Sequence, residues 1–101
     1  MNDKFISIVT VLKNQNLSNI RFYFEDVHKR LSSNFRHFEI IIVNNCICKN
    51  IQNHIRGISP NVKKDISVIN LTRKINNDNA LVAGFDKANG DYTIVLDFNF
   101  N

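Results

Sequence analysis

The sequence predicts an α/β domain in which four β-strands alternate with three helices around a mainly parallel sheet. Three observations lead to this prediction. Short apolar, β-branched runs recur four times, the segments between them change to helical spacing, and turn-forming residues separate the two kinds of segment. Such alternation implies a βαβαβαβ order with right-handed crossovers. A chain of 101 residues is long enough for a single domain with a modest core.

The first strand is expected over Phe5–Leu12, because almost every residue there is apolar or β-branched, as in a strand buried on both faces. Polar turn formers at residues 13–16 follow it. The first helix is expected over Leu17–Leu31, with Asn16 or Ser18 as its cap. One stripe of apolar side chains recurs there at helical spacing: Ile20, Phe24, Val27 and Leu31.

The middle of the chain predicts two further strands and a weaker helix between them. Phe38–Val43 is the second strand and runs into a pair of asparagines. Asn50–Ile58 is a shorter helix candidate, closed by Gly57 and Pro60. Ile66–Leu71 is the third strand.

The last helix is expected over Asn79–Ala88, with Asn77 or Asp78 as its cap. Its apolar face would be formed by Leu81, Val82 and Phe85. Gly84 lacks a side chain and would let the helix press close to the sheet. These features predict a helix that packs on one face of the sheet.

The fourth strand is expected over Tyr92–Leu96, after a turn at Gly90 and Asp91. Its β-branched and apolar residues predict a buried strand. Asp97 stands where this strand ends, and Asn99 points the same way if the backbone stays extended. In open α/β sheets, ligands bind in the crevice beyond the carboxyl ends of the strands. A carboxylate at that point can hold a sugar hydroxyl or a hydrated divalent cation.

Composition indicates a folded domain, since 44% of residues are hydrophobic and 22% are charged. The net charge of +4 and the pI of about 9.3 suit an anionic partner such as a nucleotide diphosphate, a nucleic acid or an anionic membrane surface. The cationic residues are scattered over several segments, however. We therefore favour a solvated surface and expect no nucleic-acid partner.

The chain carries no targeting signal that we recognise. Met1–Lys4 leads directly into a strand, so no signal peptide is expected, and no apolar run approaches the roughly 20 residues of a transmembrane segment. Cys46 and Cys48 are one residue apart, which is poor spacing for a disulfide and lacks the second ligand pair of a zinc site. Reduced thiols in a cytoplasmic protein are the expectation.

Polar residues that follow the strands would converge at one edge of a parallel sheet. They are Lys13, Asn14, Asn44, Asn45, Thr72, Arg73, Lys74, Asp97 and Asn99. Amides can read a base edge, a carboxylate can hold ribose hydroxyls or a cation, and an arginine can bind phosphate bidentately. By spacing alone, ordinary loops explain these residues better than a nucleotide site does. The chain has neither Gly-x-Gly-x-x-Gly nor Gly-Lys-Ser/Thr, which disfavours dinucleotide binding and a P-loop.

Other chemistry is sparse in the sequence. His28, His37 and His54 lie in different segments, without a cysteine or an acid at metal-ligand spacing, so each is interpreted as a surface residue. Neither cysteine has an obvious base beside it, which argues against a thiol nucleophile. We therefore assign no catalytic residue.

Four pieces of the chain carry a family likeness. They are ISIVTVLKN (Ile6–Asn14), FEIIIVNN (Phe38–Asn45), Arg73, and ALVAGFDKANGDYTIVLDFN (Ala80–Asn99). In this order and spacing they resemble the N-terminal, nucleotide-sugar-binding half of family 2 glycosyltransferases. The last piece is the strongest match, since it resembles the helix, the glycine turn and the strand that enters the family's Asp-x-Asp motif.

The resemblance implies a Rossmann-like, partial A-type glycosyltransferase fold that binds a nucleotide-diphospho-sugar, with Mg²⁺ or Mn²⁺ as the cation. It implies donor-binding roles for Val11, Asn14, Asn44, Asn45, Arg73 and Asp97. It also implies metal-ligand positions at Asp97 and Asn99, the latter a weak one because a neutral amide binds a hard dication less well than a carboxylate does.

The sequence also departs from the family pattern. Asn44 and Asn45 replace the usual Asp-Asp, Cys46 and Ile47 replace the following Gly-Ser, and Asn99 makes the Asp-x-Asp motif degenerate. The acceptor half with its general base would be expected after this point. We therefore expect residues 1–101 to be one truncated donor-binding domain, inactive alone. The alternative is a non-catalytic interaction module that self-associates or docks onto a complete transferase, because an uncovered strand edge invites pairing.

Overall fold

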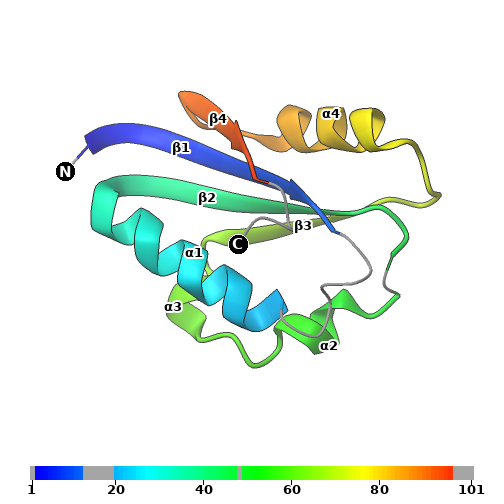
Figure 1. The fold of residues 1–101 in the computed structure, drawn as a ribbon, viewed down its shortest axis with the longest axis horizontal. Coiled ribbons are helices and arrows are strands. Elements are labelled where there is room, and N and C mark those ends of the chain that lie inside the picture. Colours follow the sequence, from blue (N-terminus) through cyan, green and yellow to red (C-terminus); the bar gives the residue numbers. More distant parts are fainter. Residues whose placement is uncertain (1, 13–19, 48, 97–101) are drawn as a thin grey trace.

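The computed structural model describes residues 2–12, 20–47 and 49–96, and it confirms the predicted alternation of strands and helices (Figure 1). The elements are β1 (Asn2–Val11), α1 (Ile20–Asn34), β2 (Phe35–Asn44), α2 (Ile51–Ile55), α3 (Pro60–Lys63), β3 (Ile66–Asn70), α4 (Asn77–Lys87) and β4 (Tyr92–Val95). The expected caps of α1 at Asn16 and Ser18 lie outside the described residues.

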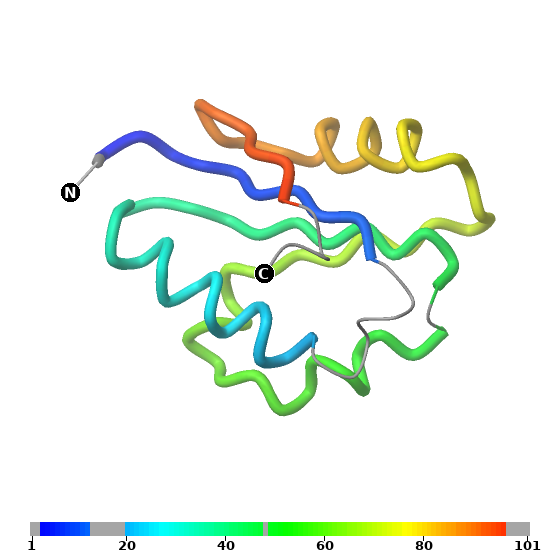
Figure 2. Tube along the Cα trace, viewed as in Figure 1, coloured from blue at the N-terminus to red at the C-terminus, as the bar shows by residue number. Residues whose placement is uncertain are grey.

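The four strands form one parallel sheet in the order β3-β2-β1-β4. The helices form two layers around it: α1, α2 and α3 lie on one side, and α4 lies on the other (Figures 1 and 2). Since β1 and β2 occupy the centre of the sheet, both faces of these strands are covered. Residues 6–12 and 40–45 are accordingly buried, and this confirms the burial predicted for the first strand.

Alternate residues of the central strands contribute to two separate apolar clusters. Ile6, Ile8, Ile40 and Ile42 pack with the predicted stripe of α1, whose members Ile20, Phe24, Val27 and Leu31 all join this cluster. Val9, Val11, Ile41 and Val43 pack with Ala80 of α4. The period of two along each strand thus decides which helical layer each side chain meets.

The predicted helix over Asn50–Ile58 is wrong in extent, because the structure has two short helices in this region. α2 ends at Ile55, and α3 begins at Pro60, a position where proline is tolerated because the first helical N–H needs no partner within the helix. The cap of α4 is also corrected. Asn76, rather than Asn77 or Asp78, accepts a hydrogen bond at its side chain from the Asn79 N–H at 2.8 Å.

α4 turns a partly different face toward the sheet from the one predicted, since Leu81 packs against the apolar cluster as expected but Val82 and Phe85 do not. Ala80 and Gly84 are its buried residues, whereas Val82 and Phe85 remain 50% and 42% exposed. A β-carbon on Gly84 would collide with Val9 Cγ1 and would lie 3.1 Å from Val43 Cγ2. The expectation that Gly84 allows close packing on the sheet is therefore confirmed.

β4 is not the buried strand that the sequence predicts. All four of its residues are exposed, because the strand order places β4 at an edge of the sheet, where it pairs with β1. The turn before β4 is nonetheless held firmly. Ser7 Oγ donates to Glu39 Oε2 at 2.6 Å and accepts from the Gly90 N–H at 2.8 Å. The Asp91 N–H donates to the Phe5 carbonyl at 2.7 Å.

Candidate functional site

A polar cleft lies where β2 and β3 end, at the carboxyl edge on which the sequence places its candidate residues. Asn44 and Asn70 are paired in the register of these strands and stand at their last positions. The cleft has a volume of about 290 Å³ and is lined by Asn44, Cys46, Lys49, Asn70 and Leu71. Neighbouring strand ends thus bring amide, thiol and ammonium groups together.

Asn44 joins the ends of the two strands. Its side chain is almost fully buried, and its Nδ2 donates to Asn70 Oδ1 at 2.8 Å. Its Oδ1 accepts from the Ile47 N–H at 3.2 Å, which fixes the turn that leaves β2. The side-chain amide therefore holds together the strand end and the turn that line the cleft.

Asn45 holds the loop between β3 and α4. Its Oδ1 accepts from the Ile75 N–H at 2.9 Å, and its Nδ2 donates to the Ile75 carbonyl at 2.7 Å. Arg73 and Lys74 lie in the same loop and are exposed. The amide of Asn45 is thus used within the protein, and it positions a cationic loop beside the strand ends.

Cys46 follows these asparagines with a φ of 59°, in the left-handed region that glycine adopts most easily. Its thiol donates to the Leu71 carbonyl at 3.3 Å, which links the turn after β2 to the end of β3. The resemblance described above places Cys46 at the position where family 2 glycosyltransferases usually have glycine. The positive φ gives a physical reason for glycine at this position.

The remaining predicted site residues are distributed unevenly. Val11 is 8% exposed and lies in the apolar cluster beneath α4, so its side chain belongs to the core under this edge. Asn14, Asp97 and Asn99 lie outside the described residues, and their roles stay predictions. The structure brings Asn44 and Asn45 together at one edge and ties the loop of Arg73 to it.

Sequence reasoning missed several residues that line this cleft. Asn70 could have been found as the polar residue at the end of the third strand, but the prediction extended that strand to Leu71. Nothing in the sequence around Lys49 indicates a site residue, because only the turn after β2 brings it to the carboxyl ends of the strands. Within residues 2–12, 20–47 and 49–96, no group of three or more histidine, cysteine, aspartate or glutamate side chains could hold a metal ion.

The fold and the polar edge together define a Rossmann-like α/β domain with a candidate ligand site at the carboxyl ends of its strands. The model of the family "Glycosyl transferase family 2" matches residues 7–98, so the chain belongs to this family. Its four-stranded parallel sheet with flanking helices is consistent with part of an A-type glycosyltransferase fold.

A solved structure supports the fold assignment. The chain is similar to a crystal structure of a hypothetical protein from Sulfolobus tokodaii, with a TM-score of 0.51 and 16% sequence identity, over 91% of this chain and 74% of that one. At that identity the likeness concerns the fold alone. No curated protein matches the sequence. In the part of the chain that the structure describes, every helix is too short or too polar to cross a membrane.

Proposed function

We propose that this chain is a glycosyltransferase-like donor-binding domain that holds a nucleotide-diphospho-sugar at the carboxyl edge of its sheet. The observation that carries the proposal is the cleft at the ends of β2 and β3, where the amides of Asn44 and Asn70 stand beside Lys49. Membership of glycosyl transferase family 2 supplies the class of ligand, and the edge supplies a polar and cationic place for it.

Each part of the edge has a role in this proposal. Lys49 in the cleft and Arg73 on the adjoining loop would bind the diphosphate, because an ammonium and a guanidinium are strong partners for phosphate oxygens. Asn44 and Asn45 would act mainly by holding the strand ends and the loop in place, since both amides are engaged within the protein. Asn14 and Asp97 would face the nucleotide.

The described part of the edge does not fit a divalent cation. The described residues that line the cleft offer amide oxygens, a thiol and an ammonium group, and no carboxylate is among these described residues. Mg²⁺ and Mn²⁺ favour carboxylate oxygens. Asp97 and Asn99 remain the proposed metal-ligand positions, and we propose no binding step that depends on the cation at the described residues.

We further propose that this domain alone does not transfer the sugar. Transfer requires a base that takes the proton from the acceptor hydroxyl, within hydrogen-bond reach of that group. Among the described residues that line the cleft, there is no carboxylate or histidine that could do so. An acceptor site and a base would have to come from other residues or from a partner transferase.

Calorimetric titration with UDP, GDP and dTDP, each with and without Mn²⁺, tests donor binding. We expect binding of at least one nucleotide, and Lys49→Ala or Arg73→Ala should weaken it by about tenfold each, because each removes a charged phosphate contact. Lys87→Ala, at the far end of α4, removes the same charge away from the cleft and should leave affinity unchanged. Absence of binding to all three nucleotides would overturn the proposal.

The alternative function, an interaction module, rests on the exposed edge strand. Tyr92, Ile94 and Val95 of β4 are 57%, 43% and 48% exposed, and Val82 and Phe85 of α4 add apolar surface. An open apolar edge can pair with another copy or with a transferase. Sedimentation that shows a concentration-dependent dimer, abolished by Ile94→Lys, would support this reading. A monomer at all concentrations that binds nucleotide would contradict it.

A further inference from the structure

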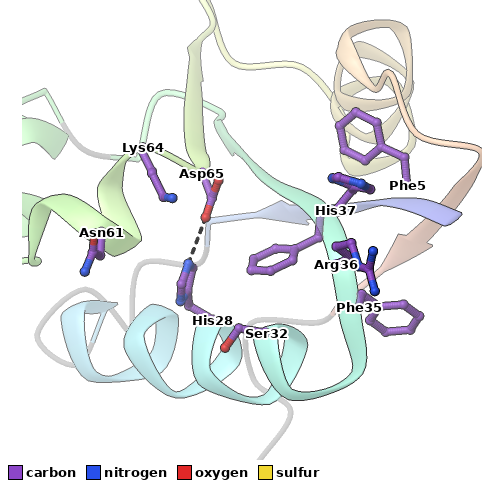
Figure 3. A pocket seen from close by; sticks show the side chains of 10 residues that line it. Phe5, His28, Ser32, Phe35, Arg36, His37, Asn61, Lys64 and Asp65 are labelled. Carbon is purple, nitrogen blue, oxygen red and sulfur yellow. Dashed lines mark hydrogen bonds and ion pairs between the residues drawn. The ribbon is translucent and has the colours of Figure 1, made fainter. Parts of the chain in front are cut away.

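A second and larger cleft lies at the opposite end of the sheet, where the strands begin (Figure 3). Its volume of about 720 Å³ lies within the range of roughly 300–1,000 Å³ that is usual for small-molecule sites. The cleft exists because β2 begins at Phe35, whereas its pairing with β3 begins only at Ile40 and Ile66. The first part of β2 therefore has an open side toward α3.

The walls of this cleft are held by contacts between three elements. His28 of α1 and Asp65, just before β3, form a hydrogen-bonded pair with Nε2 and Oδ2 2.9 Å apart, and their side chains are only 15% and 26% exposed. The Asp65 carbonyl accepts from the Ile40 N–H of β2 at 2.8 Å. The His28 ring also packs edge-on against Phe38, with 5.0 Å between centroids. The site is thus largely preformed.

The open side of β2 adds main-chain donors to the cleft. The Ile40 N–H points toward β3, since it donates to Asp65. Peptide groups two residues apart point to the same side of a strand, so the N–H groups of Arg36 and Phe38 also point that way. The pairing of β3 with β2 does not extend to these positions. Both residues line the cleft.

The charge and the walls of the cleft favour one kind of ligand. Arg36 and Lys64 supply positive charge, and the carboxylate that lines the cleft, Asp65, is directed to His28 (Figure 3). Arg36 also lies 3.4 Å from Asp3, but both side chains are well exposed, so this contact is weak. Phe35 and Phe38 also line the cleft and provide half-buried aromatic surface there.

We propose that this cleft is a binding site for a small organic anion that carries an aromatic ring. The ring packs on the aromatic wall of Phe35 and Phe38, and the anionic group meets Arg36 and Lys64. This site is separate from the proposed donor site, because the two clefts lie at opposite ends of the parallel strands. Its occupancy does not depend on whether the carboxyl edge binds a nucleotide.

Nitrogen-15 NMR titration with phenyl phosphate, inorganic phosphate and phenol tests the site. Phenyl phosphate should shift the amide signals of residues 35–38 and 64–65 with a millimolar Kd. Inorganic phosphate lacks the ring and phenol lacks the charge, so each should bind at least about fivefold more weakly. UDP in the same experiment should shift a further set of signals, near residues 44–49 and 70–75, which phenyl phosphate should leave unshifted.

A pair of charge-matched variants completes the test. Arg36→Ala/Lys64→Ala should weaken phenyl phosphate by about tenfold. Arg56→Ala/Lys63→Ala removes the same charge from the residue after α2 and from α3, outside the cleft, and should leave affinity unchanged. All four side chains are exposed, so the fold should persist. Three results would each overturn the proposal. The two double variants could weaken binding equally, phenyl phosphate could leave the signals of residues 35–38 unshifted, or inorganic phosphate could bind as tightly as phenyl phosphate.

Discussion

The side chain of Asn45 pairs with the main-chain N–H and carbonyl of Ile75 through two hydrogen bonds, one accepted at 2.9 Å and one donated at 2.7 Å. An amide suits this task because it carries a donor and an acceptor side by side, as a peptide group does. The pair crosses from the end of β2 to the loop that precedes α4, and it holds that loop against the carboxyl edge of the sheet.

Replacement of Asn45 should therefore cost stability. Asn45→Ala leaves the N–H and carbonyl of the half-buried Ile75 without this partner, and we expect the free energy of unfolding to fall by about 2 kcal/mol. Asn45→Asp should cost a similar amount, because a carboxylate cannot donate to the Ile75 carbonyl. Urea denaturation measures both, and Gln52→Ala on the exposed face of α2 serves as the control. Wild-type stability in Asn45→Asp would contradict the paired geometry.

Glycine should be accepted well at position 46. The φ of 59° strains a residue with a β-carbon by about 1 kcal/mol, so Cys46→Gly should leave the stability unchanged or raise it by up to about 1 kcal/mol. Cys46→Ala keeps the β-carbon and loses the thiol contact with Leu71, so it should be the less stable of the two. Thermal melts of both variants compare them directly, and the reverse order would show that the thiol contact outweighs the backbone strain.

Alanine at position 90 should disturb the start of β4. Its β-carbon would lie 2.6 Å from Ser7 Oγ, 2.8 Å from Ser7 N and 2.9 Å from the Phe5 carbonyl oxygen. We expect Gly90→Ala to cost about 2 kcal/mol in urea denaturation. Adding Ser7→Ala removes only the hydroxyl, so the double variant should regain little stability. Full recovery of stability would mean that the contact with the Ser7 hydroxyl, and not the contacts with the main chain of Phe5 and Ser7, causes the loss.

Two glycines offer a matched comparison of close packing. Gly84→Ala would push a methyl group into Val9 and Val43, which are both buried, and should cost about 2 kcal/mol. Gly57→Ala would meet only the side chain of Arg21, which is exposed and can move, and should cost far less. In a double-mutant cycle, Val9→Ala should relieve part of the Gly84→Ala penalty, and strict additivity of the two changes would contradict the contact.

The residues that follow the apolar run of β2 could be predicted from the sequence, whereas their hydrogen-bond partners could not. The asparagines at the end of β2 were found because they follow a long apolar run, and the family resemblance singled out Cys46. Their partners Ile75 and Asn70 are 30 and 26 residues away in the chain, so no local pattern indicates them. The pairing of His28 with Asp65 was missed for the same reason, since 37 residues separate them.

Sequence by itself determined the α/β class, the succession of strands and helices, and the burial of the first strand on both faces, because these depend on the apolar spacing of neighbouring residues. It also carried the resemblance to the family. Only the tertiary structure decided that β4 lies at an edge and is exposed, that Ala80 and Gly84 rather than Val82 and Phe85 face the sheet, and that two clefts form at opposite ends of the strands. The lateral order of strands and the closeness of helices are set by contacts between distant segments, and residue spacing along the chain does not encode them.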